Sequence, residues 1–115
     1  MGRTIFNKII SKEIPADILY ESEMVLAFRD IKPKAPIHIL IIPKSDIPGV
    51  TNLVGREHSG LLGEMFDVAN KITRELGINK EGFRLVINSG IKGGQEVQHL
   101  HIHLLGGRQM NWPPG

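Results

Sequence analysis

Three histidines alternate with apolar residues in the stretch 99–104 of this 115-residue chain: His99, His101 and His103. Side chains of a β-strand alternate between its two faces, so a strand here would place all three imidazoles on one face. On a strand, the Cα atoms of successive histidines would lie about 6.6 Å apart. On a helix, successive histidines would point in directions about 200° apart around the axis, so they would not share a face. The alternation and the β-branched Ile102 favour the strand.

A face of three imidazoles suits two kinds of chemistry. Two histidines at i and i+2 on a strand can both reach one zinc ion. A neutral imidazole can instead offer a nitrogen lone pair to a phosphate centre near physiological pH, and Gly93 and Gly94 would let backbone N–H groups crowd around the anion. The chain has no cysteine, and no carboxylate lies at a matching near spacing. Residue chemistry alone leaves the metal site and the phosphate-directed site both open.

Composition predicts a single globular domain over residues 1–115 and excludes several classes of protein. The net charge is +2 with scattered lysines and arginines, which gives no basic surface for nucleic acid. No apolar run approaches the ~20 residues of a membrane span, and the N-terminus lacks a signal-peptide core. The sequence therefore predicts a cytoplasmic protein that binds neither nucleic acid nor a membrane.

Two helices and five strands should position the histidines. Short connections favour antiparallel neighbours, so we predict an α+β domain with a five-stranded antiparallel sheet and both helices on one face. The apolar stripe of the second helix is typical of core packing. The expected helices are 4–11 and 57–76, and the expected strands are 18–20, 24–28, 37–42, 83–88 and the histidine stretch.

The stretch 99–105 resembles the signature of the histidine triad (HIT) family, in which His-x-His-x-His is followed by two apolar residues. The resemblance covers nearly the whole chain, and the tail 105–115 resembles the Hint branch. It implies a five-stranded, two-helix unit that pairs into a homodimer. Further matching motifs lie, in the family's order, at 5–10, 13–16, 28–31, 35–40 and 93–95.

The resemblance also implies roles for individual side chains. His101 would be the nucleophile that forms a nucleotidyl-histidine intermediate, and His103 would hydrogen-bond the phosphate. His99 and the upstream His38 would orient and polarise the site, and Asp30 would bind the ribose hydroxyls. The remaining nucleotide-binding positions implied by the resemblance are Phe6, Ile9, Phe28, Ile31, Leu40, Asn88, Gly94, Gln95, Glu96, Val97 and Trp112.

Three positions depart from the pattern of the animal members of the family. Glu96 stands where they have serine, a hydroxyl thought to assist the leaving group. Gln98 stands where tyrosine is common, and Asn111 replaces a histidine. The resemblance therefore leaves the preference for a leaving group open.

The function implied by the resemblance is hydrolysis of purine nucleoside 5′-phosphoramidates, with AMP or GMP as the nucleotide and no metal or other cofactor. One alternative is another HIT activity, either dinucleoside polyphosphate hydrolysis or nucleotidyl transfer. Two others are a non-catalytic module that binds purine nucleotides and a zinc-binding protein. The expected partners are the nucleotide and a second copy of the chain, in the cytoplasm and, in a eukaryote, also in the nucleus.

Overall fold

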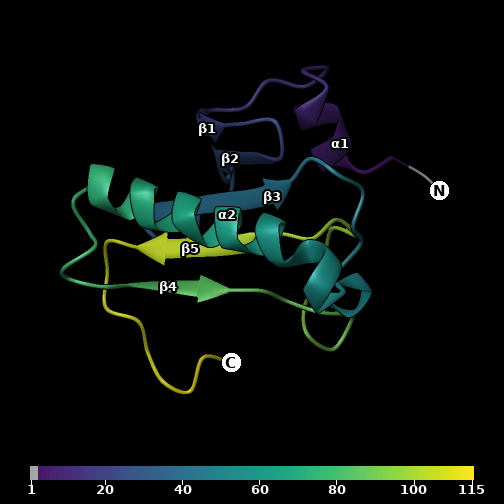
Figure 1. Ribbon diagram of the computed structural model, residues 1–115. Coiled ribbons are helices and arrows are strands. Elements are labelled where there is room, and N and C mark those ends of the chain that lie inside the picture. Colours follow the sequence, from purple (N-terminus) through teal and green to yellow (C-terminus); the bar gives the residue numbers. More distant parts are fainter. Residues whose placement is uncertain (1–2) are drawn as a thin grey trace.

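The computed structural model describes residues 3–115 and contains the five-stranded antiparallel sheet that the sequence predicts (Figure 1). The strand order is β1-β2-β3-β5-β4, and each neighbouring pair is antiparallel. The elements along the chain are α1 (Ile5–Ile10), β1 (Ile18–Glu21), β2 (Val25–Arg29), β3 (Ile37–Pro43), the 3-10 turn η1 (Val50–Asn52), α2 (Gly55–Glu75), β4 (Phe83–Val86) and β5 (Ile102–Gly106).

The two helices cover opposite faces of the sheet, so the prediction that they share one face is wrong. Ile39 and Ile41 of β3 belong to an apolar cluster that includes the buried residues of α2. Leu40 and Ile42 alternate with them and pack instead with α1. Because β3 is apolar at both sets of positions, the sequence shows that both faces are covered, but it does not show which helix covers which face.

Helix α2 anchors the larger cluster. It spans Gly55–Glu75, within two residues of the predicted range, and Gly77 follows it with φ of +73°, the left-handed conformation that commonly ends a helix. The buried stripe of α2 packs on the face that also receives Leu100, Ile102 and Leu104. Among residues 3–115, no helix has the length and apolar character needed to cross a membrane.

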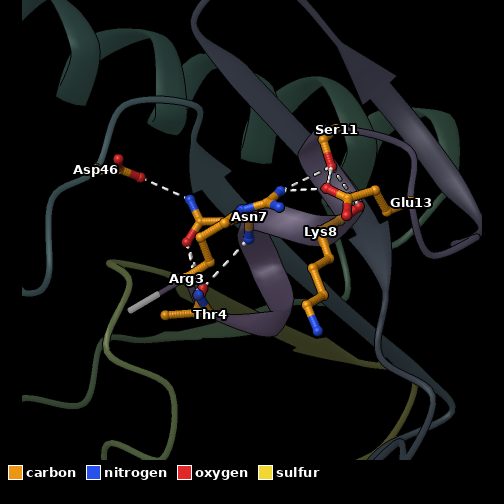
Figure 2. Close-up of polar contacts among 7 residues, drawn as sticks. All are labelled: Arg3, Thr4, Asn7, Lys8, Ser11, Glu13 and Asp46. Carbon is orange, nitrogen blue, oxygen red and sulfur yellow. Dashed lines mark hydrogen bonds and ion pairs between the residues drawn. The ribbon is translucent and has the colours of Figure 1, made fainter. Parts of the chain in front are cut away.

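Helix α1 is short and is held at both ends by polar contacts (Figure 2). Thr4 caps its first turn, where it exchanges hydrogen bonds with Asn7, and the Asn7 amide donates to Asp46 Oδ1 at 2.7 Å. Arg3 reaches the other end and pairs with Glu13. Six residues are too few for a helix that is stable alone, so these contacts and the burial of Phe6 fix its position.

Candidate active site

A cleft of about 660 Å³ opens on the face of the sheet that α1 partly covers. One side is apolar and is lined by side chains of α1, β2 and β3, among them Phe6, Phe28 and Leu40. The other is polar and is lined by histidines of β3 and of the 99–103 stretch. The predicted site residues that line the cleft are Phe6, Ile9, Phe28, Asp30, Ile31, His38, Leu40, Asn88, Gly94, Glu96, Val97, His101 and His103.

Pairing of β3 with β5 brings His38 to His103 across 65 residues of sequence. Leu40 lies opposite His103 and His38 lies opposite Leu105, so the two histidines are diagonal neighbours on one face of the sheet. Nε2 of His38 lies 2.9 Å from Nδ1 of His103. The ring centroids of His101 and His103 are 4.9 Å apart, so three imidazoles form one continuous group.

Hydrogen bonds fix the tautomers of His38 and His103. The backbone N–H of Lys34 donates to Nδ1 of His38 at 3.0 Å, so a neutral His38 carries its proton on Nε2. That N–H donates to Nδ1 of His103, which leaves the proton of a neutral His103 on Nε2. His103 therefore presents an N–H donor at its free ring nitrogen.

His101 has the opposite tautomer. Its Nδ1 lies 2.7 Å from the backbone carbonyl oxygen of His99, and because a carbonyl only accepts, Nδ1 carries the proton and Nε2 carries the lone pair. Among residues 3–115, no buried side-chain nitrogen or oxygen lacks a hydrogen-bond partner. The unbonded Nε2 of His101 is consequently accessible from the cleft.

Burial keeps these rings neutral. It is the main cause that lowers the pKa of His38 and of His101 below 6.5, and in both cases the Asp30 carboxylate opposes it. Burial, with the charges that His101 and His38 would carry, lowers the pKa of His103 to about 4. At neutral pH the site therefore combines a lone pair on one imidazole with a donor on its neighbour.

His99 lies apart from the cleft, although the sequence placed it with the other two. Strand β5 begins only at Ile102, so the prediction that the strand includes His99 and His101 is wrong. The His99 ring is 2% exposed, donates through Nε2 to the carbonyl of Pro43 at 2.8 Å, and contacts the edge of Phe6. Its backbone carbonyl, rather than its ring, contacts His101.

The segment 94–97 is held in place by Gln95, whose side chain points away from the cleft. Gln95 Oε1 accepts from the Gly90 N–H at 3.0 Å, and Nε2 donates to the carbonyls of Pro48 and Val97 at 2.8 and 3.1 Å. Gly93 permits the turn, because a Cβ there would lie 2.2 Å from the Ser89 carbonyl oxygen. Gln95 is therefore not among the residues lining the cleft.

Two other predicted residues occupy exposed positions. Ile31 is 84% exposed at the rim of the cleft, and Trp112 is 83% exposed and does not line it. The tail nevertheless returns to the cleft at Pro114, because Arg84 of β4 holds it by donating to the Asn111 carbonyl at 2.8 Å.

Asp30, His38 and His103 have potential ligand atoms that all lie within 4.8 Å of one another. A metal on His38 would need the lone pair of Nε2. A neutral imidazole has one lone pair, and the Lys34 N–H already occupies it at Nδ1. The hydrogen-bonded arrangement therefore does not fit a metal ion unless that bond breaks or the ring loses a proton.

Two contributors to this site are backbone groups: the Lys34 N–H, which bonds His38, and the His99 carbonyl, which accepts from His101. Neither could be found from residue type, since each acts through an atom that every such residue carries. The proline-rich stretch 32–36 is biased away from helix by its two prolines, and the loop that it forms before β3 delivers the Lys34 N–H.

Residues 11–110 match the HIT domain, so the match covers most of the chain. This chain belongs to the HIT family. Within that family it is a Hint-like hydrolase. The match includes β1 to β5 and every histidine of the cleft.

Similar proteins carry several names. A purine nucleoside phosphoramidase of Escherichia coli is 56% identical over 93% of this chain and 89% of its own. A 14 kDa zinc-binding protein of Brassica juncea is 54% identical over 97% and 99%, and an adenylylsulfatase of Arabidopsis thaliana is 54% identical over 97% and 76%. The crystal structure of a HIT family hydrolase of Legionella pneumophila superposes with a TM-score of 0.95, at 48% identity over 98% and 100% of the two chains.

Proposed function

We propose that this protein hydrolyses purine nucleoside 5′-phosphoramidates through a nucleotidyl intermediate on His101. The observation that carries the proposal is the pairing of opposite tautomers: a lone pair on His101 Nε2 beside an N–H donor on His103 Nε2. Phosphoryl chemistry needs a nucleophile placed in line and donors for the phosphate oxygens. The name of the E. coli relative supports the same substrate class.

The cleft suggests how the nucleotide binds. The purine would enter the apolar side formed by Phe6, Ile9, Phe28 and Leu40, of which all four side chains are buried. Asp30 would bind the ribose hydroxyls, since its Oδ1 is already fixed by the Lys32 N–H at 2.8 Å. A carboxylate held in this way loses little further freedom when a sugar docks.

The proposed reaction has two displacements. His101 Nε2 attacks phosphorus, the P–N bond breaks, and the amine leaves after gaining a proton from solvent. Water then attacks phosphorus and loses a proton to solvent, the bond to Nε2 breaks, and the nucleoside monophosphate departs. Through both steps the Nδ1–H of His101 stays on the His99 carbonyl, which stabilises the positive charge that the ring gains when Nε2 is bonded.

The decisive experiment is steady-state turnover of an adenosine 5′-phosphoramidate, compared with a diadenosine polyphosphate and measured with and without chelator. Turnover of the phosphoramidate alone, insensitive to chelator, is the expected result. Preference for the polyphosphate would favour another HIT activity. Tight AMP binding without turnover of either substrate would favour a non-catalytic nucleotide-binding module.

We also propose a homodimer, formed through the free edge of β4. This strand ends the sheet order, and all four of its residues are only half-buried. The apolar strands 37–42 and 83–88 led us to expect more apolar surface than two helices can cover, but residues 38–42 of β3 are already buried within the chain, so only β4 still supports that argument. A monomeric mass by light scattering at micromolar concentration would contradict the dimer.

We also propose that the protein is cytoplasmic.

A further inference from the structure

Glu96 brings a carboxylate into a cleft that a phosphate must also enter. Its neighbour Gln95 is bonded to Gly90 and Pro48, and the carbonyl of Val97 accepts from the same amide. The backbone is therefore held on both sides of Glu96. Glu96 is exposed and lines the cleft together with His101 and His103.

Two carboxylates line the cleft, Asp30 and Glu96, and among residues 3–115 the structure gives a polar partner to Asp30 alone. Of the cationic residues that line the cleft, Arg29 pairs with Asp17 at 3.2 Å, whereas Lys32 and Lys34, in the loop before β3, have no ion pair within the part of the chain that the structure describes. Asp30 accepts from the Lys32 N–H and lies 3.5 Å from His38 Nε2. Among residues 3–115, the structure gives Glu96 no ion pair. Glu96 is exposed, so a charged group of the substrate can reach it.

The sign of this charge opposes an ordinary phosphate ester. Like charges a few ångströms apart repel even in a strongly screening medium, so Glu96 weakens binding of an anionic nucleotide with a neutral leaving group. A positive charge on the leaving group reverses that effect. The influence of Glu96 extends to the reacting centre: burial lowers the pKa of His101, and the Glu96 carboxylate is among the charges that oppose this change.

We infer that Glu96 selects substrates whose leaving amine carries a second, positively charged group, such as a primary ammonium a few bonds from the P–N bond. The inference rests on the proposed phosphoramidase function and deepens it. It also implies that an anionic leaving group, such as a carboxylate-bearing amine, is disfavoured in this cleft.

The test compares three adenosine 5′-phosphoramidates of matched length, whose leaving amines are propane-1,3-diamine, butylamine and β-alanine. The ratio of kcat/KM values between substrates is measured for the wild type, for Glu96→Gln, and for the control Glu81→Gln. Glu81 is exposed and lies in the turn before β4, outside the cleft. Because only ratios within one variant are compared, any general effect of the substitution on rate cancels.

The wild type should prefer the diamine over butylamine by about fivefold, the effect of an ion pair in a partly exposed site. Glu96→Gln should reduce this ratio to about one and raise β-alanine relative to butylamine, and Glu81→Gln should keep the wild-type ratio. Glu96→Lys should make β-alanine the preferred leaving group of the three.

Equal ratios in the wild type and in Glu96→Gln would overturn the inference, while turnover of the butylamide would leave the proposed function standing. If the wild type turns over none of the three compounds, the proposed function fails, and the inference fails with it.

Discussion

The Nε2 atom of His38 lies 2.9 Å from the Nδ1 atom of His103, and the direction of this hydrogen bond is fixed from outside the pair. The Lys34 backbone N–H occupies Nδ1 of His38, so His38 can only donate to His103. A backbone group thereby determines that the imidazole of His103 presents a donor, rather than an acceptor, to the cleft.

Replacing His38 should therefore weaken the handling of phosphate without removing the nucleophile. In His38→Phe, Nδ1 of His103 loses its donor and the ring can adopt either tautomer. We expect kcat/KM for an adenosine phosphoramidate to fall by about tenfold, the value of one charge-assisted hydrogen bond. The Gln side chain of His38→Gln keeps both an acceptor and a donor, so the fall in kcat/KM should be smaller. Equal losses in the two variants would contradict the tautomer argument.

The alternation of residues 99–104 predicts the faces of this stretch but not its surroundings. Leu100, Ile102 and Leu104 do enter the cluster under α2, as a period of two requires. Whether His99 lines the cleft depends on where α1 lies, and Phe6 of that helix covers the ring. The position of α1 is set by contacts distant in sequence, such as Asn7 with Asp46, which no local pattern reveals.

Local sequence patterns were sufficient to predict those elements whose bounds depend mainly on their own residues. The apolar stripe of α2, the range of each helix and the range of β3 were all found to within two residues from spacing and residue type. Strand β4 ends at Val86, two residues before the predicted end at Asn88, because its length depends on pairing with β5. Gln95 matched a motif, yet only the folded loop shows that its side chain binds Pro48.

Activity should fall at acidic pH, with a midpoint below 6.5. The lone pair of His101 is lost on protonation, and burial lowers the pKa of that ring below 6.5. The expected kcat/KM is therefore constant at neutral pH and decreases only in more acidic buffers. A pH–rate profile with a midpoint above 6.5 would show that His101 is not held neutral by burial.

Protonation of His103 should destabilise the fold. With the pKa of His103 lowered to about 4, the unfolded chain binds a proton first as pH falls below 6.5, so stability decreases from there to about pH 4. The pKa difference corresponds to at most about 3 kcal/mol. Urea unfolding across this range should show a smaller loss of stability in His103→Gln than in the wild type.

Asp30→Ala should weaken binding of ribonucleotides more than that of deoxyribonucleotides. A deoxyribonucleotide lacks one of the sugar hydroxyls that the carboxylate would bond. Removing the carboxylate therefore lowers its affinity less than that of the ribonucleotide. A hydrogen bond to a charged group is worth about 1.5–3 kcal/mol, or about 10- to 150-fold in affinity. Calorimetric titration with AMP and 2′-deoxy-AMP measures both losses. Equal losses for the two nucleotides would show that Asp30 does not contact the ribose.

Removal of metal should leave turnover unchanged. Zinc could use Asp30, His38 and His103 only by displacing the Lys34 N–H from His38, so added zinc should inhibit rather than activate. The measurement is turnover after prolonged chelation, followed by addition of zinc. Loss of activity on chelation, restored by zinc, would revive a zinc-dependent site and contradict the tautomer assignment.

The last prediction separates direct attack by His101 from activation of water by the same ring. Both need a neutral imidazole, so pH dependence cannot distinguish them. Direct attack gives a covalent adduct and two in-line displacements, hence retention of configuration at phosphorus, whereas water attack gives one displacement and inversion. His101→Ala should lower the rate by several orders of magnitude with nucleotide binding largely intact, because its bond to phosphorus forms only during reaction.

His103→Ala provides the matched comparison, with a smaller loss of rate and a larger loss of binding, since its Nε2–H would contact the phosphate in the ground state as well. Rapid quenching with labelled substrate should trap the nucleotidyl-enzyme in the wild type and not in His101→Ala. Inversion at phosphorus with no trapped adduct would mean that the lone pair on His101 Nε2 takes a proton from water instead of attacking phosphorus.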